Sequence, residues 1–231
     1  MVALVLQESF KEKKIISFSG KIASGKDTLA LNLKERLKKD FNKDFELISF
    51  GKFLKEEVKD IIDNLYLNEN ILESIFKISR KDIQEFKNIL YKEKNRDINI
   101  KTQNIRELFQ FYGQNIRRKQ NEDYWILKLI NYIKKSKNNN FIITDARHLN
   151  EIESLDIFDA FRIKLIISKE EQERRILKRD GIILSEEKLN HISEKDFERY
   201  KKYDLILNVD NKEINNLSEN ILSNLVKKDL I

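Results

Sequence analysis

Short apolar runs rich in β-branched residues recur along the chain. The runs of this kind are residues 15–18, 45–50, 141–144, 161–167 and 205–209. Their length is typical of strands and too short for most helices. These segments therefore predict about five buried strands.

Between these runs, apolar residues return at helical spacing. The clearest examples, at steps of three or four residues, are Leu29, Leu33, Leu37 and Phe41, and then Ile214, Leu217, Ile221 and Leu225. Strands that alternate with helices imply right-handed crossovers, which place helices on both faces of the sheet. The pattern therefore predicts an α/β fold whose parallel sheet is flanked by helices.

Residues 63–101 fit no strand of this pattern. They contain helical stretches at 71–76 and 83–90 and a charged run at 91–101. Because α/β folds of this size are routinely single domains, we predict one domain over residues 1–231 with a helical insertion at about 63–101. The alternative is that this segment only extends the neighbouring helices.

The segment from Gly20 to Thr28 directly follows the first predicted strand and reads Gly-Lys-Ile-Ala-Ser-Gly-Lys-Asp-Thr. A strand, this loop and an amphipathic helix form the context of a phosphate-binding P-loop. The glycines let successive N–H groups point inward, the helix N-terminus adds partial positive charge, and Lys26 reaches the β and γ phosphates. The predicted ATP-binding residues of this loop are Gly20, Lys21, Ala23, Ser24, Gly25, Lys26, Asp27 and Thr28.

The position after the P-loop lysine departs from the general pattern. That pattern has Ser or Thr there to contact Mg²⁺, whereas this chain has Asp27, with Thr28 one position later. Thr28 itself, or a water molecule held by Asp27, can serve the metal. A further carboxylate, Asp145, follows the run 141–144, where it can orient Mg²⁺ or its water shell. We therefore predict ATP and Mg²⁺ as cofactors.

Phosphoryl transfer spreads negative charge over equatorial oxygens, so a kinase needs cationic groups around them. Arg147 lies at the carboxyl end of a predicted strand, where open α/β sheets bind ligands. Ser168 and Glu171 have capping-box spacing and open a helix that ends near Gly181. The arginines on this helix are Arg174, Arg175 and Arg179.

The helix and its connection to His191 predict a lid at about residues 169–192; the alternative is a solvated basic helix face. We predict that Arg174 and Arg175 bind ATP. The predicted catalytic residues are Lys26, Asp145, Arg147 and Arg179.

A third group of polar residues predicts the acceptor site. Arg106, Gln110, Gly113 and Arg117 recur at steps of three and four residues, so they share a helix face that can hold a phosphate and the edge of a base. Trp125, the only tryptophan, can stack on a base or anchor the core.

Composition narrows the class of protein. The net charge of +6 favours anionic partners, but lysine is intermixed with glutamate along the chain, which indicates solvated helix faces and disfavours nucleic acid. Without cysteine there is no disulfide, thiolate nucleophile or cysteine metal site. The apolar run at residues 1–6 is too short for a signal sequence and no run reaches 18 apolar residues, so we expect a cytoplasmic protein with no membrane partner.

Together these motifs resemble the deoxynucleoside monophosphate kinases of phages and some bacteria. The matching stretches are 18–28, 49–55, 106–113, 124–125, 144–151, 191–194 and 204–208. The resemblance implies transfer of the γ-phosphoryl group of ATP to a deoxynucleoside monophosphate, and it suggests a homodimer. It places Arg179 with the ATP loop as a lid arginine. It assigns the acceptor side to Lys55, Arg106, Gln110 and Arg117 with the pair Asp145 and Arg147.

Two departures from that family leave the preferred base open. Ala146 and Leu149 replace the more usual Val and Pro, and Val209-Asp210-Asn211 stands where Asn-Asp-Gly is expected. Animal-type phosphomevalonate kinases are a rival, since they share the Gly-Lys-x-x-Ser-Gly-Lys-Asp loop and an Asp-x-Arg strand end. The helix of Arg106 and Gln110 favours the nucleotide acceptor. A third alternative is a non-kinase NTP-binding module associated with nucleic acid.

Overall fold

The computed structural model describes residues 12–64, 67–92, 102–181 and 195–231. The chain forms two compact units, a sheet unit of Met1–Ser49 and Tyr132–Ile231 and a helical unit of Phe50–Asn131. The end of the predicted lid at 182–192, with His191, and the charged run from residue 93 lie outside the described residues. The prediction of one domain with an insertion at 63–101 stays a prediction.

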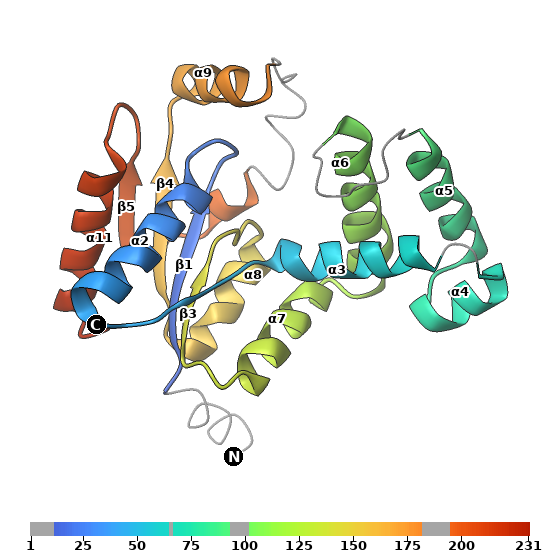
Figure 1. Cartoon of the computed structure of the whole chain (residues 1–231), viewed down its shortest axis with the longest axis horizontal. Coiled ribbons are helices and arrows are strands. Elements are labelled where there is room, and N and C mark those ends of the chain that lie inside the picture. Colours follow the sequence, from blue (N-terminus) through green and yellow to red (C-terminus); the bar gives the residue numbers. More distant parts are fainter. Residues whose placement is uncertain (1–11, 65–66, 93–101, 182–194) are drawn as a thin grey trace. The chain divides into compact units, whose positions relative to one another are not determined.

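The sheet unit contains five parallel strands, shown in Figure 1. They are β1 (Lys14–Gly20), β2 (Glu46–Ile48), β3 (Asn140–Ile143), β4 (Phe161–Ile166) and β5 (Leu205–Asn208). Their order across the sheet is β2-β3-β1-β4-β5. Ile16 of β1 is opposite Ile142 on one side and Phe161 on the other. The central strand therefore leads into the Gly20 loop, as in P-loop folds, which confirms the predicted fold class.

One predicted strand is shorter than its apolar run. The run 45–50 forms a strand only over Glu46–Ile48, and Phe50 already begins the helix α3 (Phe50–Asp63). Glu46 and Ser49 interrupt the run, but single polar residues also occur inside strands and helices, so hydrophobicity alone could not set this boundary.

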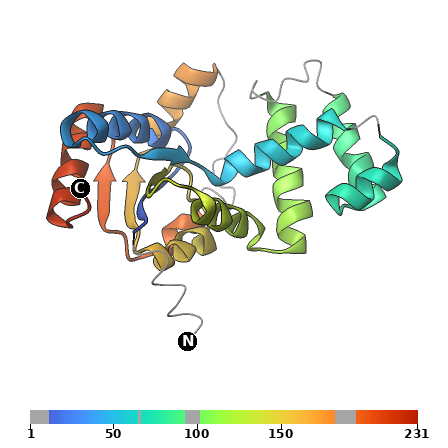
Figure 2. The same cartoon turned by 60° about the horizontal axis from the view of Figure 1, so that its bottom comes forward.

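Helices cover the sheet on both faces. Successive strand residues point to opposite faces, and both Ile15 and Ile16 are buried, so neither face of β1 is open to solvent. On one face, α2 (Lys26–Phe41) lies beside α11 (Ile214–Lys227), as Figure 2 shows. The predicted stripes are largely confirmed, because Leu29, Leu33, Leu37, Ile221 and Leu225 are buried in this cluster.

Further elements of the sheet unit lie between β3 and β5 along the chain. They are α8 (Leu149–Ser154), the 3-10 helix η2 (Leu155–Phe158), α9 (Lys169–Asp180) and the 3-10 helix η4 (Asp196–Arg199). α9 directly follows β4, and in Figure 1 it lies at the same end of the sheet as the loop after β1. Parallel strands bring these two connections to one edge of the sheet.

The helical unit has a core of its own. It contains α3, α4 (Glu69–Phe76), α5 (Arg80–Tyr91), α6 (Gln103–Gln110), the π-helix η1 (Phe111–Arg118) and the first part of α7 (Tyr124–Lys135). Leu72, Phe86, Leu108 and Tyr112 are fully buried in it. Asn68, Ser79 and Thr102 accept hydrogen bonds from the first turns of α4, α5 and α6, so each start is fixed by a polar side chain.

None of the helices in the described ranges has the length and hydrophobicity needed to cross a bilayer.

Packing of α2 against the sheet can be tested with two leucines of this helix. We expect Leu33→Ala to lower the free energy of unfolding by about 2–5 kcal/mol, because the fully buried side chain leaves a cavity. Leu31→Ala, at a residue that is 49% exposed, should change it by less than about 0.5 kcal/mol. Urea unfolding followed by circular dichroism measures both, and equal losses would contradict the assigned burial.

Candidate active site

The loop between β1 and α2 has the backbone of an anion-binding turn. Ala23 and Gly25 adopt left-handed conformations with φ of 62° and 88°. Gly25 is the N-cap of α2, and its carbonyl oxygen accepts the first helical hydrogen bond from the Leu29 N–H at 2.9 Å. Alternation of left-handed and ordinary conformations turns successive N–H groups toward one point, at the positive end of a helix dipole.

Lys26 lies within this loop. Its ammonium Nζ donates to the carbonyl oxygens of Gly20 at 2.6 Å and Lys21 at 2.8 Å and lies 3.4 Å from the Ser24 Oγ. The side chain is only 6% exposed. These contacts hold the ammonium group inside the loop, at the N-terminal end of α2.

Gly20 is required by its position beside β4. A Cβ at this residue would lie 2.8 Å from the Leu165 carbonyl oxygen and 3.0 Å from the Ser24 Oγ. Its φ of 152° is also one that side chains rarely adopt. The sequence prediction that this glycine permits a special backbone conformation is therefore supported by the packing of the central strands.

The helix α9 is attached to the loop by two side chains. Arg175 donates through Nη1 to the Ala23 carbonyl oxygen at 3.4 Å and through Nη2 to the Val209 carbonyl oxygen at 2.8 Å. Gln172 donates to the Ile22 carbonyl oxygen at 3.1 Å. Arg175 was among the predicted ATP-binding residues, whereas Gln172 was missed. Its only signal was a position three residues before Arg175, on the same helix face.

The other two arginines of α9 point to carboxylates of their own helix. Arg174 pairs with Glu171, and Arg179 pairs with Asp180 through two hydrogen bonds of 2.8 Å. Hydrogen bonds from Arg174 and then Arg175 lower the pKa of Glu171 to about 2. The hydrogen bonds to Asp180, together with the charge of Asp27 at the start of α2, raise the pKa of Arg179. This arginine therefore lies near the loop.

The predicted capping box of α9 forms only in part. Ser168 Oγ accepts from the Glu171 N–H at 3.3 Å, as predicted. Glu171 does not close the box, because its carboxylate binds the two arginines and the Ser168 N–H donates to Asp210 instead. Arg174 and Arg175, three and four residues after Glu171, therefore compete with the capping box for its carboxylate.

Asp145 and Arg147 follow the end of β3. Because β3 is parallel to β1, they lie at the same edge of the sheet as the loop between β1 and α2. Both side chains are partly buried. Glu151 is buried and accepts hydrogen bonds from the backbone N–H groups of Arg147 at 2.8 Å and His148 at 3.0 Å. This carboxylate therefore fixes the turn that carries Arg147. His148 occupies the N-cap position of α8.

Asp196 fixes the other side of the same turn. It accepts from the Leu149 N–H at 2.9 Å, lies 3.5 Å from the His148 Nδ1 and pairs with Arg199. Burial opposes ionisation, but the Leu149 N–H and the Arg199 guanidinium outweigh it, and the pKa of Asp196 is lowered.

A groove of about 630 Å³ lies along the outer face of α2. Thr28 and Leu31 line it from α2, and Lys212 and Ile214 line it from the chain that follows β5. Leu31 is 49% and Ile214 40% exposed, so the groove offers apolar surface within one helical turn of the phosphate loop. The sequence prediction included Thr28 but missed Leu31, Lys212 and Ile214, since nothing in their sequence context marks them as a binding surface.

Two predicted acceptor residues, Lys55 and Gln110, are exposed in the helical unit, and Arg106 is partly buried. Arg117 is buried and pairs with Glu57 at 3.0 Å. Trp125 is 4% exposed, and its indole N–H donates to the Gly113 carbonyl oxygen at 3.3 Å. Of the two roles that the sequence left open for Trp125, the structure therefore shows the core anchor.

The predicted shared helix face spans a change of helix type. α6 ends at Gln110 and continues as the π-helix η1, after which the Lys119 N–H bonds the Gln114 carbonyl oxygen five residues earlier. Arg106 and Gln110 lie on the α-helix, whereas Gly113 and Arg117 lie on the π-helix. Gln110 is exposed, whereas Gly113 and Arg117 are buried, and their role in acceptor binding stays a prediction.

The loop fits a nucleotide-bound Mg²⁺ ion. Among the described residues, no three His, Cys, Asp or Glu side chains gather as a metal site. Mg²⁺ is commonly held by substrate phosphates with only one or two protein oxygens. Thr28 and Asp27 are exposed in the first turn of α2 and offer such oxygens.

No model of a protein family matches the sequence, and no curated protein matches it significantly. Among the solved structures that align with this chain, two do so over most of their lengths. A gluconokinase from Sinorhizobium meliloti 1021 is 13% identical with a TM-score of 0.44, over 94% of this chain and 93% of that one. An uncharacterized protein from Eubacterium ventriosum ATCC 27560 is 16% identical with a TM-score of 0.44, over 93% and 99%. Similarity at this level says nothing about activity.

The contact between Gly20 and β4 can be tested with two glycines. Gly20→Ala should lower the free energy of unfolding by about 2–5 kcal/mol, the sum of backbone strain and overpacking against Leu165. Gly181→Ala is the control, since Gly181 has a φ of 68° with no atom within 4 Å of the added Cβ. It should cost only about 1–2 kcal/mol. Equal stability of the two variants in urea unfolding would refute the contact.

Proposed function

We propose that this chain is an ATP-dependent phosphotransferase that moves the γ-phosphoryl group of ATP onto a deoxynucleoside monophosphate, giving the diphosphate. The observation that carries the proposal is the Lys26 ammonium, which is enclosed by the Gly20 and Lys21 carbonyl oxygens at the N-terminus of α2. This arrangement suits a triphosphate, whose outer oxygens can accept from the Lys26 ammonium at the positive end of the α2 dipole.

The reaction depends on stabilisation of the phosphoryl charge and on positioning of the two substrates more than on proton transfer. The acceptor phosphate oxygen is already a good nucleophile, so no general base is required. On the donor side, Lys26 neutralises the γ-phosphoryl oxygens, and Arg175 keeps α9 attached to the loop. Arg179 and Arg147 supply further positive charge at the same edge of the sheet, where Asp145 can orient Mg²⁺ or its water shell. Mg²⁺ bound to ATP, with Thr28 or Asp27 as protein ligand, would supply additional charge neutralisation.

The groove on α2 gives the donor nucleoside a place next to the phosphates. Leu31 and Ile214 offer apolar contacts for a planar base, and Lys212 and Asn32 offer polar atoms at its edge. A nucleotide whose base binds in this groove would keep its triphosphate at Lys26.

The acceptor is assigned to the helical unit, whose predicted binding residues are Lys55, Arg106, Gln110 and Arg117. Gln110 can hydrogen-bond a base edge, whereas the cations suit a monophosphate. Phosphomevalonate offers a phosphate but no base for Gln110. The nucleotide acceptor therefore uses more of these residues.

Removal of the loop cation tests the donor assignment. Lys26→Ala should reduce turnover by about 10³–10⁵, equivalent to roughly 4–7 kcal/mol of barrier, because the phosphoryl oxygens lose a fixed cation. Acceptor-dependent ADP release measures the rate. Lys38→Ala, at an exposed position of the same helix, should keep normal turnover. Near-normal turnover by Lys26→Ala would sink the assignment.

A panel of acceptors tests the substrate class. We expect initial rates of ADP release to be highest with one or more of the four deoxynucleoside monophosphates, with lower rates for ribonucleotides and none for phosphomevalonate. The reverse order would establish the rival kinase. ATP binding without turnover of any acceptor, combined with salt-sensitive retardation of labelled DNA in a gel, would instead indicate a nucleic-acid-associated module.

A further inference from the structure

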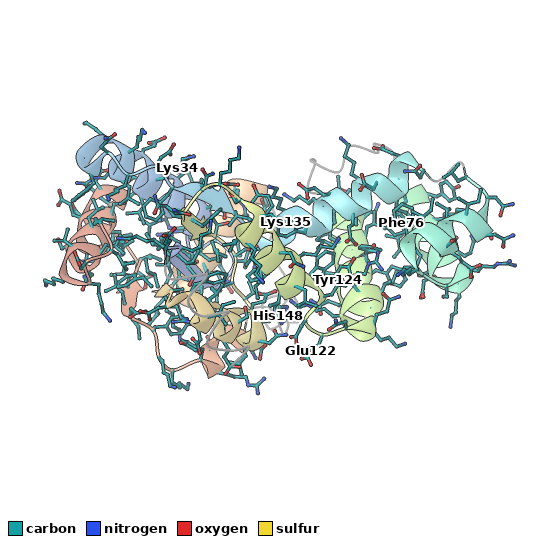
Figure 3. All side chains as sticks on the ribbon, turned by 90° about the horizontal axis from the view of Figure 1, so that it is seen from below. Lys34, Phe76, Glu122, Tyr124, Lys135 and His148 are labelled. Carbon is teal, nitrogen blue, oxygen red and sulfur yellow. The ribbon has the colours of Figure 1, made fainter. Side chains whose placement is uncertain are left out.

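One carboxylate in the helical unit collects four donors. Glu57 of α3 accepts from the hydroxyl groups of Tyr112 at 2.8 Å and Tyr124 at 2.5 Å and from Arg117 Nε at 3.0 Å. Lys128 of α7 pairs with it at 2.8 Å. Figure 3 labels Tyr124 at the start of α7. We call these five residues the Glu57 cluster.

Glu57 stays ionised at neutral pH, and the cluster as a whole has a net positive charge. Burial alone would raise the pKa of Glu57, but the hydrogen bonds from Lys128 and Tyr124 and the charge of Arg117 outweigh it, and the pKa is lowered. Desolvation lowers the pKa values of Arg117 and Lys128, but both are raised overall. Interactions with Tyr112 and then Glu57 outweigh the desolvation of Arg117, and the hydrogen bond and charge of Glu57 outweigh that of Lys128. Arg117 and Lys128 therefore share the single negative charge of Glu57 at neutral pH, so the cluster favours the binding of a further anion nearby.

The cluster fixes the plane of the Arg117 guanidinium. Its central carbon lies 5.1 Å from the Tyr112 ring centroid and 4.8 Å from that of Tyr124. Nε donates to Glu57 and to the Tyr112 hydroxyl, and Nη1 donates to Gln120 at 3.2 Å. Within the described residues, Nη2 of Arg117 makes no hydrogen bond, so one edge of a held guanidinium remains for a ligand.

The π-helix makes this arrangement possible. Tyr112 and Arg117 are five residues apart, which on an α-helix would turn their side chains away from each other. The extra residue per turn of η1 brings them together at 2.8 Å. π-helical turns in proteins often occur at functional sites, because the wider turn has a cost in stability.

We propose that Glu57 is a positioning residue for the acceptor, which holds Arg117 so that its free Nη2 edge, with Lys128 beside the cluster, receives the phosphate group of the acceptor. Glu57 itself touches no substrate and acts through Arg117. The inference rests on the proposed function, because it concerns the acceptor of that reaction. A guanidinium held in one plane binds a phosphate with less loss of side-chain entropy than a free one.

The test is a double-mutant cycle with Glu57→Gln, Arg117→Lys and the double variant. Glu57→Gln should raise the KM for the best acceptor by about tenfold to a hundredfold and leave the KM for ATP within about twofold. Arg117→Lys should raise the acceptor KM similarly, because lysine lacks the planar fork. The double variant should be no worse than Arg117→Lys, because Glu57 has no other route to the substrate.

Two further variants control for folding and for charge. Glu56→Gln removes the same charge from an exposed neighbour on α3 and should leave both KM values unchanged. If Glu57→Gln fails to fold by circular dichroism, Tyr124→Phe replaces it, since it removes one donor to Glu57. This variant should raise the acceptor KM by about threefold to fivefold while the KM for ATP stays unchanged.

The outcomes separate this inference from the function on which it rests. A wild-type protein without acceptor-dependent ADP release would reject the proposed function and this inference with it. An active wild type whose Glu57→Gln variant keeps its acceptor KM within about twofold, or changes both KM values equally, would reject only the positioning role. Multiplicative effects in the double variant would also reject it, because they would show that Glu57 acts independently of Arg117.

Discussion

The sheet unit depends on an ammonium group enclosed by backbone oxygens. Lys26 can reach the Gly20 carbonyl oxygen only because β1 ends and α2 begins within six residues of each other. That short connection requires the left-handed turns at Ala23 and Gly25, and it requires Gly20 to have no side chain beside Leu165. The packing of the central strands and the charge of the loop are therefore two results of one geometric constraint.

Charged side chains in the helical unit are stabilised in a different way. In the loop, the Lys26 ammonium donates to backbone carbonyl oxygens, whereas in the Glu57 cluster two cations and two hydroxyl groups share one carboxylate. Burial of ionised groups is costly unless each has good partners, and here the partners come from α3, η1 and α7. Such a cluster orders several helices around a single side chain, so it couples the shape of the unit to its charge.

Sequence reasoning was most successful where one residue type has one physical role. The five apolar runs gave the strands, the Gly-Lys spacing gave the phosphate loop, and the leucine stripe gave the buried face of α2. It was less successful where partners come from distant segments. Ser168 has capping-box spacing, yet its N–H donates to Asp210, 42 residues later, and Gln172 contacts a loop 150 residues earlier. The helix of Arg106 and Arg117 was interpreted with α-helical periodicity, which a π-helix does not follow.

The sequence by itself determined the α/β class, the position of the phosphate loop and the candidate cations, because these follow from local hydrophobicity, glycine and charge. Only the tertiary structure decided which of these cations lie next to backbone oxygens, which pair with carboxylates and which remain exposed. It also decided that Trp125 is a core residue and that Glu57 gathers four donors. The reason is that a hydrogen-bond partner is chosen by proximity in space, and proximity between distant segments is set by the packing of the whole unit.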